Sequence, residues 1–371
     1  MEVYMDIKFM KRALELAEKG VGYTKPNPLV GAVIVRDGKI IGEGYHEICG
    51  SHHAEVNAFR NAKEDVSGAT MYVTLEPCSH YGRTPPCANA IVEKGIKKVV
   101  IGLLDPNPLV SGRGVEILKN NGIEVVVGIL ADEGKKLNEI FFKYIATKLP
   151  FGILKTAMTL DGKIASAIGD SKWITNEFSR QYVHELRHRV SGIMVGIGTV
   201  LADDPELTTR LKNREGVDPV RIIIDSTAKI PLNAKVLNLG SKAKTIVATT
   251  EKADKQSLKD IRDKGADVII TPLKNDKVDL SYLMQQLGQR EIDSVLIEGG
   301  GALNFSALEE GIVDKVISFI APKIIGGAAS KTPVGGAGIS HIKNAIQLEN
   351  IQILRFQEDI MIEAYLRKGE L

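Results

Sequence analysis

The chain of 371 residues is 44% hydrophobic and 25% charged, which is typical of a globular protein with roughly two domains and excludes a disordered or fibrous one. Its 48 Lys and Arg nearly balance 46 Asp and Glu, so a long nucleic-acid substrate is disfavoured. The start lacks the apolar stretch of a signal peptide and no later run approaches a membrane span, so we expect a cytoplasmic protein without a membrane partner.

The first half of the sequence alternates helical and strand patterns. A helix is predicted from Asp6, as its N-cap, to Gly20, and two strands within 30–45 turn at Asp37-Gly38, the strongest hairpin signal in the chain. Further helices are predicted at 53–63, 87–95 and 131–150, the last ending at Pro150, and further strands at 69–77, 97–106 and 123–130. This half therefore reads as one sheet flanked by helices.

The second half restarts the alternation. The predicted strands lie at 151–160, 192–201, 220–226, 245–250, 266–272, 294–300, 315–325 and 359–367. Because most are separated by helical patterns, we expect a mainly parallel sheet with both faces covered. The sequence thus predicts two α/β domains, 1–147 and 148–371.

A candidate metal site lies in the first domain. His53 in HAEVNAF and Cys78 and Cys87 in EPCSHYGRTPPC supply three ligands, the number that a catalytic zinc site uses. Glu55 stands where the H-x-E…P-C pattern of zinc deaminases places its general acid/base, although the two cysteines are nine residues apart instead of three. The alternative is a structural site closed by Cys49 or a neighbouring histidine, His52 or His80.

The residue types suit hydrolytic deamination. Two thiolates and one imidazole would hold one Zn²⁺ per chain and leave a position for water. Glu55 could take a proton from that water and return it to the leaving amine, whereas a lone glutamate is more often a solvated helix residue. Cys49 is interpreted as an idle thiol.

Three stretches together, TKPNPLVGAVIV (24–35), HAEVNAF (53–59) and EPCSHYGRTPPC (76–87), resemble the bifunctional pyrimidine deaminase/reductase family of riboflavin biosynthesis, and the resemblance covers essentially the whole chain. It implies an N-terminal cytidine-deaminase-like domain in which Asn27 contacts the pyrimidine and His46 and Asn107 line the same pocket. By their own signal, Asn27 and Asn107 are equally compatible with turns next to proline.

KTAMTLDGKIA (155–165) and SKWIT (171–175) resemble the dihydrofolate-reductase-like domain of the same family. No G-x-G-x-x-G follows the first strand, but VLIEGGGALNFS (295–306) offers glycines at a strand-to-helix turn, which could bind phosphate or be a tight turn only.

Residue by residue, the resemblance implies an NADPH site and a substrate site in this domain. The NADPH contacts would be Ala157, Trp173, Thr199, Asp203, Ser226, Gly300, Gly301, Ala302, Leu303, Asn304, Phe305 and Ser306. The substrate contacts would be Ser171, Arg187, Leu207, Arg210 and Glu298, with Lys155 and Glu298 as catalytic residues near the reacting carbon. Arg187 and Arg210 suit a sugar phosphate, although Arg187 could be a solvated helix residue and Trp173 a core residue.

The expected function is therefore a zinc hydrolase joined to an NADPH-dependent oxidoreductase. The first would deaminate 2,5-diamino-6-(5-phosphoribosylamino)pyrimidin-4(3H)-one to 5-amino-6-(5-phosphoribosylamino)uracil, and the second would reduce the ribose of this product to the ribityl form. We also expect a homo-oligomer. Two alternatives remain at this stage: a zinc nucleoside or nucleotide deaminase with an unrelated C-terminal domain, and a zinc-stabilised module that binds RNA.

Overall fold

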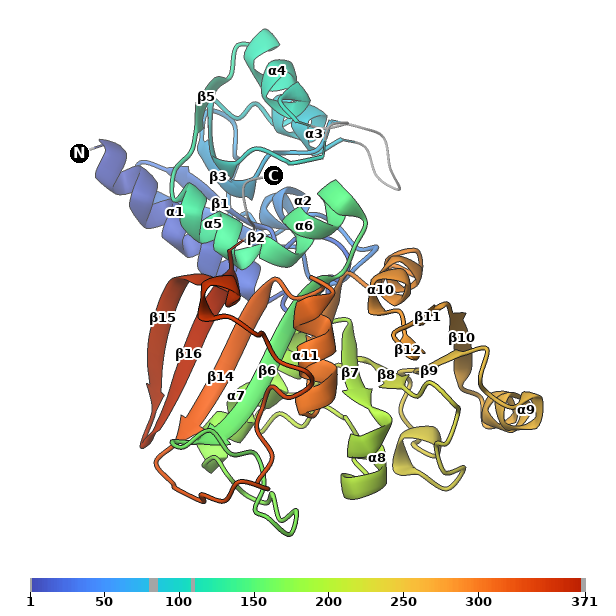
Figure 1. Ribbon diagram of the computed structural model, residues 1–371. Helices are drawn as coiled ribbons and strands as arrows, with labels where there is room; N and C mark the ends of the chain where they lie inside the picture. The colour runs from blue at the N-terminus through green and yellow to red at the C-terminus, as the bar shows by residue number, and fades with distance from the viewer. Residues whose placement is uncertain (1, 80–85, 108–110, 368–371) are drawn as a thin grey trace. The chain divides into compact units, whose positions relative to one another are not determined.

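The computed structural model describes residues 2–79, 86–107 and 111–367, and the chain divides into two compact units, Met1–Lys148 and Leu149–Leu371 (Figure 1). Among the described residues, no helix has both the length and the apolar character needed to span a bilayer.

The first unit contains a five-stranded sheet in the order β2-β1-β3-β4-β5. β1 is antiparallel to β2 and β3, whereas β3, β4 and β5 are parallel. The predicted hairpin is confirmed, because Asp37 and Gly38 both adopt positive φ, 48° and 73°, between β1 and β2. The elements are α1 (Glu2–Glu18), β1 (Gly31–Arg36), β2 (Lys39–Tyr45), α2 (Ala54–Arg60), β3 (Thr70–Leu75), α3 (Cys87–Glu93), β4 (Lys98–Leu103), α4 (Arg113–Asn120), β5 (Glu124–Val127), α5 (Ala131–Leu137) and α6 (Glu139–Thr147).

Both faces of this sheet are covered, because alternate strand residues enter two different cores. One core joins the sheet to α1 through Phe9, Met10, Ala13, Leu16, Val33, Val35, Tyr72 and Val100. The other joins it to α2, α3 and α4 through residues that include Ala32, Ile34, Ala54, Ala58, Met71, Val73, Ala88, Ile91, Ile101 and Leu118. The sheet thereby holds the starts of α2 and α3 close to the end of β3.

Two predictions for this unit are wrong. Asp6 does not cap α1, which already begins at Glu2; instead Asp6 is buried within the helix and accepts a hydrogen bond of 2.8 Å from the Tyr72 hydroxyl. The helix predicted over 131–150 is two helices that meet at Asn138. The buried Asn138 side chain bonds both backbone groups of Leu29, at 2.8 and 2.9 Å, which fixes the break between α5 and α6.

The second unit contains a nine-stranded sheet in the order β10-β9-β8-β7-β13-β6-β14-β16-β15. The pairs from β10 to β14 are parallel, which confirms the mainly parallel prediction, and β16 and β15 are antiparallel. The elements are β6 (Phe151–Thr159), α7 (Glu177–Arg189), β7 (Gly192–Gly196), α8 (Ile197–Asp203), β8 (Val220–Ile224), η1 (Lys235–Leu237), β9 (Thr245–Thr250), α9 (Lys255–Asp263), β10 (Asp267–Thr271), β11 (Leu273–Lys274), β12 (Lys277–Val278), α10 (Leu280–Gly288), β13 (Ser294–Ile297), α11 (Gly301–Glu309), β14 (Lys315–Ala321), η2 (Ile342–Asn344), β15 (Leu348–Phe356) and β16 (Asp359–Leu366).

Strand side chains in this unit also alternate between two cores. Met194 of β7 enters the core shared with α10 and α11, while its neighbours Ile193 and Val195 enter the core shared with α8 and α9. The strand predicted over 192–201 is too long, because the chain turns into α8 at Ile197. β15 was not predicted; it is an edge strand whose residues are almost all exposed.

Candidate active sites

The three predicted metal ligands lie where two helices begin and one strand ends. His53 is the N-cap residue of α2, Cys78 follows β3, and Cys87 is the first residue of α3. Their ligand atoms all lie within 4.8 Å of one another. His53 Nδ1 is 3.6 Å from Cys78 Sγ and 3.3 Å from Cys87 Sγ.

This cluster fits zinc. Zn–N and Zn–S bonds of about 2.0–2.3 Å in a tetrahedral site place the ligand atoms roughly 3.5 Å apart, and both measured distances agree with this spacing. The cluster includes no fourth His, Cys, Asp or Glu among the described residues. Cys49 is exposed and does not belong to it, and His80 lies outside the described residues. The donor set is therefore the open, three-ligand type.

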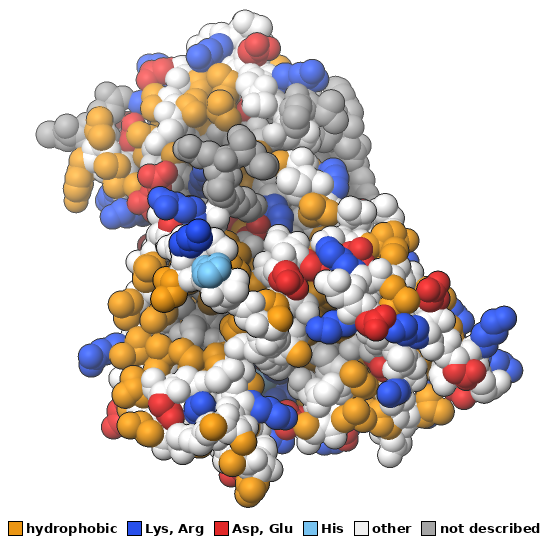
Figure 2. Space-filling view, in the orientation of Figure 1, with side chains coloured by type: hydrophobic (Ala, Val, Ile, Leu, Met, Phe, Trp, Pro, Cys, Tyr) orange, Lys and Arg blue, Asp and Glu red, His pale blue; other side chains and the backbone are white. Residues whose placement is uncertain are grey.

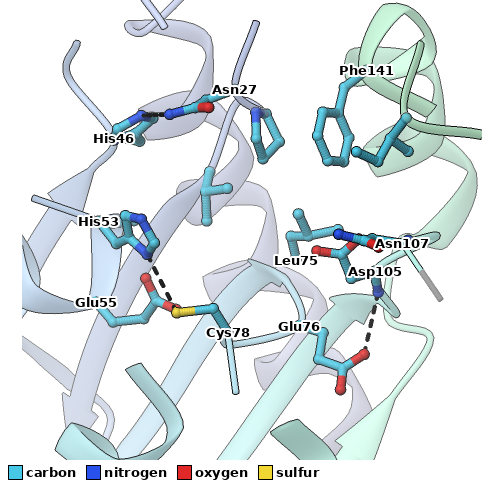
Figure 3. A pocket seen from close by; sticks show the side chains of 14 residues that line it. Asn27, His46, His53, Glu55, Leu75, Glu76, Cys78, Asp105, Asn107 and Phe141 are labelled. Atoms are coloured by element: carbon cyan, nitrogen blue, oxygen red, sulfur yellow. Dashed lines mark hydrogen bonds between the residues drawn. The ribbon is translucent and has the colours of Figure 1, made fainter. Parts of the chain in front are cut away.

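Glu55 lies beside the ligands without belonging to the cluster (Figure 3). It is on the first turn of α2, two residues after His53, and is only 3% exposed. Burial raises the pKa of its carboxyl to about 7, so the group can both take and give a proton near neutral pH. Gly44 of β2 permits this placement, because a Cβ there would collide with the backbone of Ala54 and Ala58 in α2.

Asn27, His46 and Asn107 line one pocket together with His53, Glu55 and Cys78 (Figure 3). His46 is buried, and its Nδ1 lies 3.1 Å from the His52 carbonyl oxygen, which can only accept a hydrogen bond. Nδ1 therefore carries the proton, and Nε2 accepts from the Asn27 amide nitrogen at 3.2 Å. Burial lowers the pKa of His46, which agrees with a neutral ring.

Sequence analysis did not identify the remaining residues that line this pocket. Glu76 and Asp105 are the acidic ones, at the carboxyl ends of the parallel strands β3 and β4. That position could have indicated them, since ligand sites gather at the carboxyl ends of parallel strands. The apolar ones come from four segments that are far apart in the sequence: Pro28 and Val30, Ala54, Leu75, and Phe141 and Ile145.

The second unit holds a charged cluster around Glu298, which follows β13. Arg187 Nε and Nη2 donate to the two carboxylate oxygens of Glu298 at 2.8 and 3.1 Å, and Lys155 Nζ lies 2.9 Å from Oε2. Burial alone would raise the pKa of Glu298, but Arg187 and Lys155 outweigh it and hold this pKa well below its ordinary value. Glu298 is therefore a carboxylate at every working pH.

Two hollows of the second unit contain most of the predicted reductase residues. One is lined by the predicted residues Ser171, Thr199, Asp203, Gly300, Gly301, Ala302 and Leu303. The other is lined by the predicted residues Trp173, Thr199, Asp203, Arg187, Leu207, Arg210 and Glu298. Thr199 and Asp203 of α8 line both. Lys172 and Lys235 also line the second hollow and Lys331 the first, and sequence analysis missed all three.

Five predicted cofactor contacts are not among the residues that line these two hollows: Ala157, Ser226, Asn304, Phe305 and Ser306. Asn304 is buried, and its side-chain nitrogen donates to the Pro333 carbonyl at 2.7 Å. The Asn304 side-chain nitrogen therefore bonds to the protein itself. Trp173 is 64% exposed, which excludes the alternative that it is a core residue.

The glycine-rich turn fits a phosphate group. Gly300 is the N-cap residue of α11 and supplies no side chain to its first N–H groups. A Cβ on Gly300 would project into open space, whereas a Cβ on Gly301 would come within 2.8 Å of the Thr332 carbonyl oxygen. Helix N–H groups beside a hollow without a side chain in the way are suited to bind phosphate.

Comparisons with known proteins match both units. The cytidine and deoxycytidylate deaminase zinc-binding region matches residues 4–103, and the RibD C-terminal domain matches residues 150–362. The riboflavin biosynthesis protein RibD of Actinobacillus pleuropneumoniae is 51% identical over 96% of this chain and 94% of its own length. The corresponding protein of Aquifex aeolicus is 48% identical, over 96% and 98%.

The chain belongs to the RibD family.

Solved structures agree with this assignment. Acinetobacter baumannii RibD has a TM-score of 0.88 with 40% identity, and covers 99% of this chain and 100% of its own. A diaminohydroxyphosphoribosylaminopyrimidine deaminase/5-amino-6-(5-phosphoribosylamino)uracil reductase from Thermotoga maritima has a TM-score of 0.87 with 42% identity and the same coverage. The predicted fold class is confirmed: a cytidine-deaminase-like domain followed by a RibD reductase domain.

As a RibD protein, the chain is a bifunctional enzyme of riboflavin biosynthesis with a deaminase and a reductase domain, as predicted. Its cofactors are zinc in the deaminase and NADPH in the reductase. The alternative of a deaminase with an unrelated C-terminal domain is wrong, because that domain is the RibD one. The alternative of a zinc-stabilised binding module is wrong as well, because the protein is an enzyme.

Proposed function

We propose that the deaminase half converts 2,5-diamino-6-(5-phosphoribosylamino)pyrimidin-4(3H)-one and water into 5-amino-6-(5-phosphoribosylamino)uracil and ammonia. The reductase half then reduces the ribose of this product to the ribityl form with NADPH. The observation that carries the proposal is Glu55, a buried carboxyl beside three ligands that fit zinc and in one pocket with Asn27 and Asn107. The name of the Thermotoga protein contains the same two reactions.

In the deaminase site, His53, Cys78 and Cys87 would hold the zinc ion, which lowers the pKa of a water molecule when bound. Glu55 takes a proton from that water and returns it to the leaving amine, a transfer that the pKa of about 7 permits in both directions. Asn27 and Asn107 orient the pyrimidine. His46 fixes the Asn27 amide, since its Nε2 accepts from the amide nitrogen and leaves the amide oxygen turned away from the imidazole (Figure 3).

In the reductase site, NADPH supplies the hydride for C1′ of the open-chain ribose. The predicted cofactor contacts that line the two hollows carry this part of the proposal: Trp173, Thr199, Asp203, Gly300, Gly301, Ala302 and Leu303. Ser171, Leu207, Arg210, Arg187 and Glu298 face the substrate, and the two arginines serve its 5-phosphate. Reduction also needs a proton near the reacting carbon. In this proposal Lys155 supplies it, and the carboxylate of Glu298 holds Lys155 Nζ in place at 2.9 Å.

Each activity resides in one domain of this proposal, with residues 1–147 as the deaminase and 148–371 as the reductase. Expressed separately, each half should keep one activity, since each has its own cores. Two folded halves that lack both activities when separated would contradict this assignment.

A homo-oligomer in the cytoplasm completes the proposal. β15 is an edge strand with exposed apolar residues, among them Ile351 at 60% and Ile353 at 65%, and Figure 2 shows hydrophobic side chains gathered over this part of the second unit. Such an edge is suited to pairing with a second chain. Light scattering of the purified protein should give a mass above that of one chain. The cytoplasm is proposed because a reducing compartment protects zinc-binding thiolates from oxidation.

Product analysis tests the two reactions together. Purified protein is incubated with the diaminopyrimidine phosphate, and the products are identified by mass. Without NADPH, we expect one amino group to be replaced by oxygen; with NADPH, we expect the further gain of two hydrogens. Reduction without deamination, or deamination of cytidine nucleotides in preference, would contradict the proposed substrate.

A further inference from the structure

Glu76, the residue that directly follows the strand β3, has a buried carboxyl group that accepts four backbone hydrogen bonds. The residue is only 4% exposed. Oε2 accepts from Asp105 N at 3.2 Å and Gly112 N at 3.0 Å, and Oε1 accepts from Gly114 N at 2.9 Å and Val115 N at 3.3 Å. Because all four donors are backbone N–H groups, the Glu76 side chain ties four backbone positions together.

The four donors lie at the two ends of one loop. Asp105 comes two residues after the end of β4, and Gly112, Gly114 and Val115 lie at the start of α4. The N-cap residue of α4 is Gly112, which has no side chain to accept from the first turn, and Glu76 takes this capping role from another strand. One carboxyl group therefore binds backbone N–H groups on both sides of Asn107.

Asp105 connects Glu76 to Asn107 by hydrogen bonds. Asp105 Oδ1 accepts from Asn107 N at 2.8 Å, and the Asn107 carbonyl accepts from Ser111 N at 2.9 Å. Asp105, Asn107 and Glu76 all line the pocket of the metal cluster (Figure 3). A chain of hydrogen bonds thus runs from Glu76 through Asp105 to the proposed pyrimidine contact.

Glu76 is also close in the sequence to a residue of the metal cluster. Pro77 alone separates Glu76 from the ligand Cys78. The start of α4 approaches this segment so closely that a Cβ on Gly114 would collide with the Pro77 carbonyl oxygen and lie 3.1 Å from Glu76 Oε1. The absence of a side chain at Gly114 allows the helix start and the ligand segment to meet.

We infer that Glu76 is a positioning residue of the deaminase: it sets the place of the Asn107 loop relative to the ligand Cys78. This rests on the proposed role of Asn107. Without the Glu76 carboxyl group, the distance between Asn107 and the metal cluster would no longer be fixed. The three metal ligands themselves would be unchanged. If Asn107 holds the pyrimidine equally in the ground state and in the transition state, loosening this contact raises KM more than it lowers kcat.

Glu76→Gln tests the inference with almost unchanged volume. The amide nitrogen would face two backbone N–H donors, so two hydrogen bonds are lost. We expect the deamination KM to rise roughly 10- to 100-fold, with a much smaller change in kcat, and with zinc content and reduction of supplied 5-amino-6-(5-phosphoribosylamino)uracil unchanged. Glu116→Gln is the matched control, since Glu116 is an exposed acid in the same first turn of α4 and should leave KM unchanged.

A double-mutant cycle with Asn107→Ala separates this role from a general loss of stability. If Glu76 acts through Asn107, the fold-increase in KM of the double variant is smaller than the product of the two single fold-increases. If the two residues act independently, the double variant shows the full product. A folded, zinc-replete Glu76→Gln protein with the parent KM, or a fully multiplicative cycle, overturns the inference. Asn107→Ala with the parent KM would instead remove the proposed role of Asn107, while Glu76→Gln alone still reports on Glu76.

Asp105→Ala decides the matter if Glu76→Gln does not fold. It removes the acceptor for Asn107 N and leaves Glu76 and α4 in place. We expect the same selective rise in the deamination KM. An unchanged KM in this variant would show that the hydrogen-bond chain does not position Asn107.

Discussion

Arg187 donates two parallel hydrogen bonds to Glu298, from Nε to Oε1 at 2.8 Å and from Nη2 to Oε2 at 3.1 Å. Its Nη1 also donates to the Thr208 carbonyl at 3.0 Å. Arg187 is therefore not the solvated helix residue that the sequence left open. Its guanidinium is fixed in place before any substrate binds, and only part of its donor capacity remains for a phosphate.

Replacing Arg187 should destabilise the reductase unit. Arg187→Ala would leave Glu298, whose side chain is 9% exposed, with Lys155 as its remaining cation. Removing one partner of a buried ion pair costs about 3–5 kcal/mol, measurable as a lower midpoint of urea unfolding. Arg214→Ala is the control: its pair with Glu185 is 42% exposed on both sides and should contribute less than about 1 kcal/mol. Equal effects of the two variants would contradict the expectation.

Arg210 is the arginine whose loss should affect phosphate binding without unfolding. It lines the same hollow as Glu298, its side chain is 58% exposed, and it pairs with Glu206 at 3.3 Å. Arg210→Ala should raise the reductase KM for the phosphorylated substrate roughly 10- to 150-fold and leave that for NADPH nearly unchanged.

Lys212→Ala is a matched control for Arg210→Ala. Lys212 is equally exposed and also pairs with a glutamate, but it does not line the hollow. A dephosphorylated substrate should be used poorly by the parent and no worse by Arg210→Ala. If Arg210→Ala weakens NADPH binding alone, this arginine belongs to the cofactor site.

Zinc content should follow the three clustered ligands. Cys87→Ser removes a thiolate of the cluster and should abolish stoichiometric zinc, whereas Cys49→Ser changes an exposed thiol outside it and should retain one zinc per chain. Elemental analysis of the purified variants measures both. Loss of zinc from Cys49→Ser would indicate a closed, four-ligand site.

Glu55→Gln should separate metal binding from proton transfer. The amide cannot take a proton from water, so deamination should fall by roughly 10² to 10⁴, while zinc content and reduction of supplied 5-amino-6-(5-phosphoribosylamino)uracil persist. Rapid-quench or steady-state assays with the two substrates measure this. A variant that deaminates at the parent rate would place the proton carrier at another residue.

His184 predicts a pH dependence of stability in the reductase unit. Burial, assisted by Arg187 and Arg210, lowers the pKa of His184 to about 4, and its Nδ1 accepts from Arg210 N at 3.2 Å. Between about pH 6.5 and 4 the unfolded chain therefore binds a proton that the folded protein does not, so stability falls as pH decreases through this window. His184→Asn keeps an acceptor near the Nδ1 position without the titration. Its Tm should fall less than that of the parent between about pH 7.5 and 5, and an equal or steeper fall would refute the assignment.

Local patterns were sufficient for several parts of this protein. Asp37-Gly38 predicted the β1–β2 hairpin because two consecutive residues with positive φ suit that turn. His53, Glu55, Cys78 and Cys87 predicted the zinc cluster with a glutamate outside it, because their types and order match the H-x-E…P-C pattern of zinc deaminases. The mainly parallel sheet followed from strands that alternate with helices.

What the sequence alone determined is therefore the set of elements whose signal is local: turns, helix and strand periodicity, and the spacing of ligand residues. Only the tertiary structure decided the contacts between distant segments. Asn138 splits a helix by bonding Leu29, 109 residues away, and Arg187 is neutralised by Glu298, 111 residues away. Glu76 likewise caps α4 from β3. Each depends on a buried polar group that must find a partner because water is excluded. The packing of the sheet, and not the neighbouring residues, decides which partner lies within reach.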